Sequence, residues 1–145
     1  MKRVLISHRG NVTGPDPKNE NKIEYINKAL KLGYDVEIDV WYVKGEFYLG
    51  HDRPDYLVDD QYLKQKKLWC HAKNYEALYQ MMKKGIHCFW HETDKVTITS
   101  KGYVWAYPGQ QPLKNSIAVM PEINNEDTSA SAGVCSDYIE KYKEN

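Results

Sequence analysis

Two acids and two histidines in the N-terminal part of the chain have a spacing that could support catalysis. Glu37 and Asp39 stand two residues apart in an apolar, strand-like segment, so both would project from the same side of that strand. A pair of carboxylates suits a hard divalent cation. His8 precedes this segment and His51 follows it, and two histidines can accept a proton from an attacking oxygen and protonate a leaving oxygen. These residues therefore predict metal-assisted cleavage of a phosphodiester.

The motifs that contain these residues are His8-Arg9-Gly10, Glu37-Ile38-Asp39 and His51-Asp52. Their order and separation resemble those of the glycerophosphodiester phosphodiesterase family, within the wider phosphatidylinositol phospholipase C-like superfamily. The resemblance covers mainly residues 4–73. Glu20-Asn21 is similar to the core of the family's Pro-Glu-Asn-Thr segment, although Lys18-Asn19 precedes it here, and residues 133–137 are similar to the last barrel strand.

The resemblance implies a role for each of these residues. Glu37 and Asp39 would bind one divalent metal ion, and the two histidines would form the acid/base pair. Arg9 would hold a phosphate oxygen, because its planar guanidinium can meet two oxygens at once. The alternative for Arg9 is a structural salt bridge to Glu20. Asp52 would orient its histidine neighbour or a loop amide rather than bind metal.

His71-Ala72-Lys73 is the clearest departure from the family pattern, which has Glu-x-Lys at this strand. Lys73 keeps its place, so the resemblance implies that it binds the substrate phosphate. If His71 replaces the missing acid as a ligand, the preference shifts from Ca²⁺ toward Mn²⁺ or Zn²⁺ and Mg²⁺ is still permitted. Alternatively, His71 is no ligand and water fills the position, or Glu92 and His91 supply the missing group. Glu122 and Asp137, at presumed strand ends, are candidate acceptors for His8, Lys73 or Arg9.

The elements that would position these residues alternate between strands and helices in the first part of the chain. The expected strands are 3–7, 34–43, 46–49, 68–73, 86–92 and 134–136, with helices after Asn21 and after Asn74. The segments 96–99, 103–107 and 117–120 are also β-like, but no helical segments separate them. Asn21 and Glu24 form a predicted capping box, and residues 52–67 are predicted to be irregular. The segment Val96–Thr99 is expected to be a hairpin arm or an irregular excursion, because too few residues follow it for a parallel crossover.

The chain has 145 residues, whereas a full β/α barrel typically needs about 250. The fold class that we predict is therefore α/β, a reduced, helix-poor TIM-type β/α barrel with the phospholipase C-like phosphodiesterase fold, formed by a single domain over residues 1–145. The tryptophans on the predicted strands are expected to close core layers.

Twenty basic and twenty acidic residues balance, so no overall field recruits nucleic acid. The apolar run at Val4 to Ile6 is too short for a signal peptide, and no run approaches a membrane span. Cys70, Cys88 and Cys135 lie in apolar stretches, which predicts reduced, packed thiols in a cytoplasmic protein.

The predicted function is hydrolysis of small glycerophosphodiester-like molecules by a metal-dependent enzyme, with a divalent ion as cofactor (Mg²⁺, Mn²⁺ or Ca²⁺, with Zn²⁺ a further candidate). Only residues 53–67 separate His51-Asp52 from the next strand, so we expect an open cleft and little discrimination among alcohols. One alternative is a non-catalytic or structural protein that binds a phosphoryl ligand on a degenerate barrel. Another is a metal-dependent hydrolase of a cyclic phosphate or a sugar ester.

Overall fold

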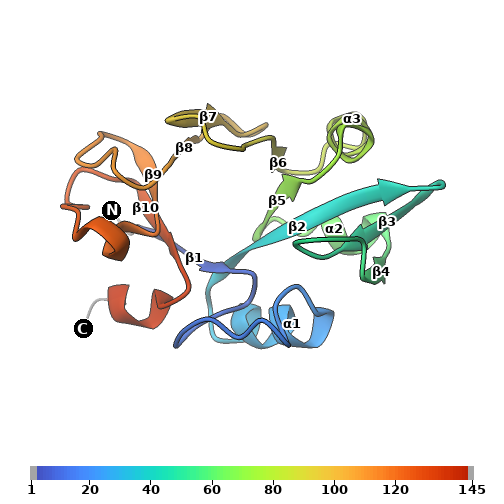
Figure 1. Cartoon of the computed structure of the whole chain (residues 1–145), viewed down its shortest axis with the longest axis horizontal. Coiled ribbons are helices and arrows are strands. Elements are labelled where there is room, and N and C mark those ends of the chain that lie inside the picture. The colour runs from blue at the N-terminus through green and yellow to red at the C-terminus, as the bar shows by residue number, and fades with distance from the viewer. Residues whose placement is uncertain (1–2, 144–145) are drawn as a thin grey trace.

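The computed structural model describes residues 3–143, which form ten strands in one mixed sheet with few helices (Figure 1). The elements in chain order are β1 (Val4–His8), α1 (Ile23–Lys31), β2 (Asp35–Val43), β3 (Glu46–Leu49), β4 (Tyr56–Val58), α2 (Asp60–Leu63), β5 (Leu68–Ala72), α3 (Tyr75–Lys83), β6 (Cys88–Phe89), β7 (Val96–Ile98), β8 (Val104–Ala106), β9 (Ser116–Val119), η1 (Pro121–Asn124), β10 (Gly133–Ser136) and η2 (Ile139–Tyr142). The α/β class and the scarcity of helices confirm the sequence prediction. Among these residues, no helix has the length and apolar character needed to cross a membrane.

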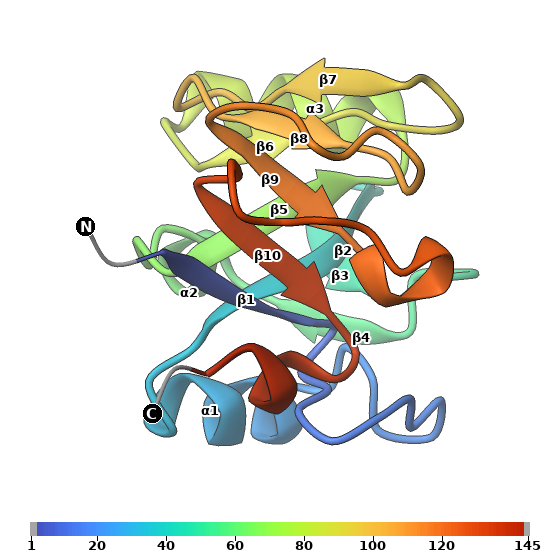
Figure 2. The same ribbon diagram turned by 90° about the vertical axis from the view of Figure 1, so that its left-hand side faces the viewer.

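Seven strands follow one another in parallel, in the order β6, β5, β2, β1, β10, β9 and β8. Their carboxyl ends therefore meet at one edge, and Figure 2 shows the arrowheads of β5, β9 and β10 on the same side. The hairpin of β3 and β4 adds to β2, and β7 adds to β8, both in antiparallel pairing. Within residues 3–143 no strand ladder joins β6 to β8, but the Ser100 N–H donates to the Cys88 carbonyl at 2.8 Å.

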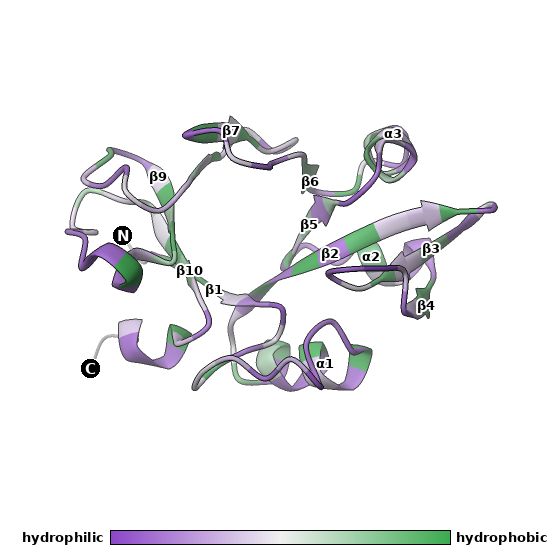
Figure 3. Ribbon diagram, in the orientation of Figure 1, coloured by the Kyte–Doolittle hydropathy of each residue, from purple (hydrophilic) through white to green (hydrophobic). Residues whose placement is uncertain are grey.

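The outer side of β2 forms the larger core. Val36, Ile38 and Val40 are fully buried there, in one cluster with residues of α1 and α3 such as Ile26 and Met81. Removing a side chain of this size from water stabilises the fold by about 1.5 to 3 kcal/mol. Both helices carry apolar and polar residues, and Figure 3 shows bands of both colours on α1. Neighbouring residues of a strand point to opposite sides of the sheet. Glu37 and Asp39 alternate with the three buried residues of β2 and therefore face the other side.

The inner side of the curved sheet holds a second core. Six strands each contribute one buried residue to it: Ile6, Trp69, Phe89, Trp105, Ile117 and Cys135. Trp69 and Trp105 close core layers, as the sequence predicted, and their rings lie 5.8 Å apart. Trp90, which follows β6, is instead 38% exposed. This inner core lies next to the polar residues at the carboxyl edge, on the same side of the sheet.

The two long helices begin differently. Asn74 caps α3 by accepting a hydrogen bond from the Ala77 N–H at 3.0 Å, as predicted. The predicted capping box at α1 is wrong, because the N-cap is Lys22 and it makes no side-chain cap. Asn21 has a left-handed backbone (φ 68°), and its amide binds the buried Asp39 rather than the helix terminus.

Two further expectations about the strands and loops are wrong. The segment 52–67 is ordered rather than irregular, since β4 pairs with β3 and Asp59 caps α2 by accepting from the Tyr62 N–H at 2.8 Å. The strand expected at 86–92 is limited to Cys88–Phe89, where it pairs with β5. The segment Val96–Ile98 forms a hairpin with β8, which confirms the predicted hairpin arm.

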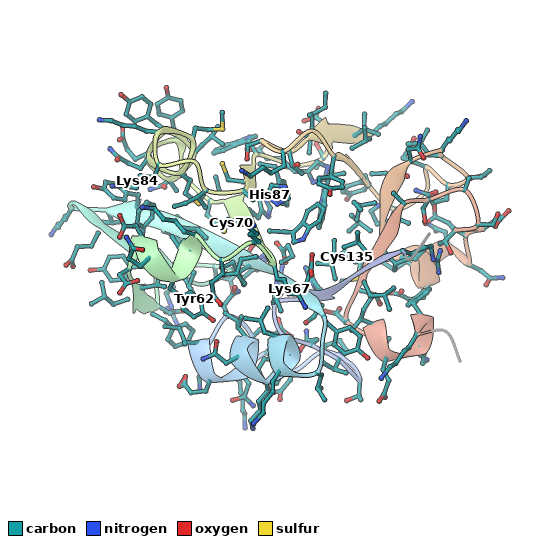
Figure 4. All side chains as sticks on the ribbon, turned by 180° about the vertical axis from the view of Figure 1, so that it is seen from behind. Tyr62, Lys67, Cys70, Lys84, His87 and Cys135 are labelled. Atoms are coloured by element: carbon teal, nitrogen blue, oxygen red, sulfur yellow. The ribbon has the colours of Figure 1, made fainter. Side chains whose placement is uncertain are left out.

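Cys70, Cys88 and Cys135 are free and buried, which confirms the prediction of packed thiols. Burial raises the pKa of the Cys70 and Cys135 thiols well above the ordinary value. In Figure 4, Tyr62 and Lys84 lie on the side of the molecule that carries α2 and α3, and Cys135 lies toward the interior of the curved sheet.

Candidate metal centre and acid/base site

The candidate residues come from neighbouring strands and meet at the carboxyl edge of the parallel sheet. His8 is the last residue of β1, and Glu37 and Asp39 lie on the inner side of β2. His71 lies on β5 and pairs directly with Asp39, and Lys73 is the first residue after this strand. The strand registers therefore bring these five residues, which are far apart in sequence, to one end of the sheet.

Glu37, Asp39 and His71 form a three-residue cluster whose potential ligand atoms all lie within 4.8 Å of one another. Nδ1 of His71 is 3.4 Å from Oδ1 of Asp39 and 3.7 Å from Oε2 of Glu37. Both acids are buried, with 2% and 0% of their surfaces exposed. A buried pair of carboxylates requires compensation by a cation or by hydrogen-bond donors.

Two oxygens of this pair, Oε1 of Glu37 and Oδ1 of Asp39, are buried without a hydrogen-bond partner among the described residues. Orphaned buried acceptors are rare, because each retains the free-energy cost of losing water. Two carboxylates and one imidazole are also a donor set that suits Mn²⁺ or Zn²⁺ and permits Mg²⁺. The residues therefore fit a divalent cation.

The hydrogen bonds of His71 leave one ring nitrogen available to such an ion. Its Nε2–H donates to the carbonyl oxygen of His91 at 2.7 Å, and its ring stacks on Phe89 at 5.1 Å. A backbone acceptor on one nitrogen leaves the lone pair of the other, Nδ1, directed at the two carboxylates. Burial alone would lower the pKa of His71, but Asp39 and Glu37 outweigh this effect and raise it to about 9.

Asn21 holds Asp39 in place and was not identified as a site residue from the sequence. Its Nδ2 donates to Oδ2 of Asp39 at 2.9 Å, and its Oδ1 accepts from the Asp39 N–H at 2.9 Å. Asn21 is 1% exposed. The similarity of Glu20-Asn21 to the Pro-Glu-Asn-Thr segment could have indicated a role for Asn21 at the site. The spacing of Asn21 and Glu24 instead predicted a helix cap.

Arg9 spans three groups of the site from a left-handed backbone (φ 60°). Its Nη1 pairs with Oε1 of Glu20 at 3.3 Å, which is the salt bridge that the sequence suggested, and its Nε lies 3.1 Å from Oδ2 of Asp39. Its Nη2 donates to Nδ1 of His51 at 2.7 Å. Burial would raise the pKa of Asp39, but His51, His71 and Arg9 hold it well below the ordinary value.

His8 is oriented by Asp137, the residue that follows β10. Its Nδ1–H donates to Oδ1 of Asp137 at 2.7 Å, and its Nε2 faces Oε1 of Glu37 at 3.7 Å. Burial alone would lower the pKa of His8, but Asp137 and Glu37 outweigh this effect and raise it. The expected role of Asp137 as an acceptor for His8 is confirmed.

His51 reaches the site from a tight turn after β3. A Cβ at Gly50 (φ 153°) would come within 2.0 Å of the Arg53 carbonyl oxygen, so only glycine permits the turn. His51 lies 3.6 Å from Asp39, with a side chain that is 44% exposed. Asp52 does not orient it closely, because its carboxylate is 91% exposed and 3.8 Å away.

The structure places the remaining candidate residues differently from one another. Lys73 makes no ion pair within the described ranges; it directly follows β5, and its backbone N–H donates to the Val40 carbonyl at 2.8 Å. Glu122 accepts from the hydroxyls of Ser136 and Tyr142, so its expected role as an acceptor for site cations is wrong. His91 contributes its backbone carbonyl rather than its ring, and Glu92 is exposed.

The assembled site contains a three-residue cluster that could hold one cation, the guanidinium of Arg9 beside it, and a histidine on each side of the acids. Such a set can bind an anionic substrate and transfer protons to and from it. Protein-family models, curated proteins and solved structures were compared with this chain, and none of them matches it.

Proposed function

We propose that this protein is a metal-dependent phosphodiester hydrolase that acts on small glycerophosphodiester-like substrates. The observation that carries the proposal is the buried Glu37, Asp39 and His71 cluster, with orphaned oxygens and a histidine on each side. A site that only bound phosphate would need cations and amides, whereas paired histidines suit proton transfer.

We further propose that the sheet is a reduced TIM-type barrel of the phospholipase C-like phosphodiesterase class. Seven consecutive strands run in parallel, and six of them contribute a buried inner residue to one core. Barrel enzymes carry their chemistry at the carboxyl ends of the strands, which is where the candidate residues gather. These features support the barrel class.

In this proposal, the phosphodiester lies between the cluster and the basic side chains. A divalent cation held by Glu37, Asp39 and His71 would polarise the phosphoryl oxygens. Arg9 and Lys73 bind the phosphate and stabilise the negative charge that grows in the transition state. Arg9 suits this role because its guanidinium already lies at the site, beside Asp39.

His8 and His51 exchange the roles of base and acid. His8 donates its Nδ1 proton to Asp137, so its Nε2 is free to take a proton from the attacking oxygen. His51 gives a proton to the leaving alcohol and is replenished by solvent, to which its side chain is partly exposed. The attacking group is water or a neighbouring hydroxyl of the substrate.

The outer position of residues 56–63 supports a preference for small substrates. Val58 and Leu63 pack into the same core cluster as the outer residues of β2. This segment therefore lies on the opposite side of the sheet from the site and does not cover the leaving group. An open site offers few contacts that distinguish one alcohol from another.

The test is a hydrolysis screen of the purified protein against glycerophosphodiesters, a cyclic phosphate and a sugar phosphate ester, each with Mg²⁺, Mn²⁺, Ca²⁺ or Zn²⁺. Mass detection of the products would identify the attacking group, since attack by a substrate hydroxyl leaves a cyclic phosphate. Glu37→Gln and Asp39→Asn serve as controls, and both should lose activity and bound metal. Absence of turnover with every metal and substrate would contradict the proposal.

One observation favours a second candidate, a protein that binds a phosphoryl ligand without turnover. Arg9 is already paired with Asp39 and with His51, so its guanidinium partly compensates the acid that a cation would neutralise. In the same screen, calorimetric binding of glycerol phosphate without hydrolysis of any diester would support this candidate.

A further inference from the structure

A chain of hydrogen bonds connects the two basic groups of the site through one buried amide, that of Asn11. Asn11 is fully buried, and its Nδ2 donates to Oδ1 of Asp137 at 2.8 Å and to Oε2 of Glu20 at 3.0 Å. Asp137 holds His8, and Glu20 holds Arg9. The amide therefore joins the carboxylate behind the candidate base to the carboxylate behind the candidate phosphate ligand.

The orientation of this amide is fixed by Tyr25. The Tyr25 hydroxyl donates to Oδ1 of Asn11 at 2.8 Å, so the amide nitrogen must face the two carboxylates. The Tyr25 ring can approach closely only because Gly10 has no side chain, since a Cβ there would come within 2.5 Å of it. Both N–H groups and the carbonyl of the Asn11 amide thus have partners.

We propose that Asn11, locked by Tyr25, is a positioning residue that sets His8 and Arg9 relative to each other. Two carboxylates that converge on one point repel each other, and the two N–H groups of a neutral amide hold them together without adding charge. Loss of this amide leaves Asp137 with His8 as its one remaining side-chain partner among the described residues, so the two can shift together. Glu20 keeps the Asp16 N–H on the same oxygen at 2.8 Å and continues to hold Arg9, so His8 loses its fixed position relative to Arg9. This inference rests on the proposed function for its effect on catalysis, but its structural part does not.

The test compares Asn11→Ala and Tyr25→Phe with wild type, and uses Tyr62→Phe as a matched control. Tyr62 makes the same type of contact, from its hydroxyl to Oδ1 of Asn27 at 2.7 Å, but it joins α2 to α1 on the outer side of the sheet. Asn11→Ala should lower kcat about 10- to 100-fold and raise KM, as is typical when an outer hydrogen-bond partner is lost. Tyr25→Phe should show a smaller loss of the same kind, and Tyr62→Phe should leave both constants unchanged.

A second readout does not depend on turnover. In nitrogen-edited NMR spectra, the Nδ1 proton of His8 should be visible and protected in wild type and in Tyr62→Phe, because Asp137 accepts it. It should exchange rapidly with water in Asn11→Ala. If wild type cleaves no phosphodiester, the proposed function fails, and this spectrum still tests the positioning.

A double variant distinguishes positioning of His8 by Asn11 from a general effect of Asn11 on the fold. The double variant Asn11→Ala with Asp137→Asn should lose little more kcat than Asp137→Asn alone, because Asn11 acts through Asp137. A protected His8 proton in Asn11→Ala would overturn the inference. So would losses of kcat that multiply fully in the double variant.

Discussion

Replacement of Asn21 by glycine removes the two hydrogen bonds that hold Asp39 and keeps the left-handed backbone that this position requires. Asn21→Gly is more informative than Asn21→Ala, because alanine adds about 1 to 2 kcal/mol of backbone strain at positive φ. The bond to the Asp39 N–H is neutral and worth about 1 kcal/mol, whereas the bond to the Asp39 carboxylate is charge-assisted and worth about 2 kcal/mol. The free energy of unfolding should therefore fall by about 3 kcal/mol.

The matched control is Asn125→Gly. Asn125 also has a left-handed backbone (φ 51°) and is exposed, and its side chain makes no hydrogen bond to other residues in the described part of the chain. The same substitution there should change stability by no more than about 0.5 kcal/mol. Any effect of glycine on the unfolded chain is common to both variants, so their difference isolates the hydrogen bonds to Asp39.

Urea unfolding of wild type and both variants, followed by tryptophan fluorescence, measures these free energies. A second measurement, titration with Mn²⁺, should show 10- to 100-fold weaker binding by Asn21→Gly, because Asp39 is no longer oriented. Equal stability of the two glycine variants would refute the assignment of Asn21 as the residue that holds Asp39.

Three further predictions concern the acid/base pair, selectivity and pH. His8→Ala and His51→Ala should each lower turnover by about 10²- to 10⁴-fold without unfolding the protein, as circular dichroism would verify, and wild-type rates in either variant would remove that residue from the mechanism. Across a panel of glycerophosphodiesters kcat/KM should vary little, and a hundredfold preference for one head group would show that a loop such as 108–115 or 124–132 closes over the site. Burial, with a smaller contribution from Lys101, lowers the pKa of His87 to about 4, so stability should decline as pH falls from about 6.5 to 4, by at most about 3 kcal/mol. In urea unfolding at pH 4.5 and 7, His87→Gln should reduce the difference in the free energy of unfolding between the two pH values. An unchanged difference would contradict the assignment of this pH dependence to His87.

The parts of the fold that follow from local pattern could be predicted from the sequence. Alternating apolar residues identified β2 and placed Glu37 and Asp39 on one side of it, and Asn74 identified the start of α3. These features depend on neighbouring residues alone. The grouping of His71 with the acids could also be anticipated, because adjacent parallel strands end at the same edge.

Contacts between distant segments could not be read from local pattern. The sequence offered both Asp137 and Glu122 as acceptors for His8, Lys73 or Arg9, and the choice of Asp137 for His8 depends on the pairing of β1 with β10. Asn21 satisfied the rules for a helix cap, but a buried carboxylate offered its amide a stronger partner. Local propensity decides such cases only where no tertiary contact competes.

The proposed site holds one divalent ion between Glu37, Asp39 and His71, and anomalous diffraction from a crystal soaked in Mn²⁺ would locate that ion. We expect one peak bonded to both carboxylates, with Nδ1 of His71 about 2.1 to 2.3 Å away and Nε2 still donating to the His91 carbonyl. A peak elsewhere, no peak at saturating Mn²⁺, or an ion without an imidazole ligand would contradict the claim.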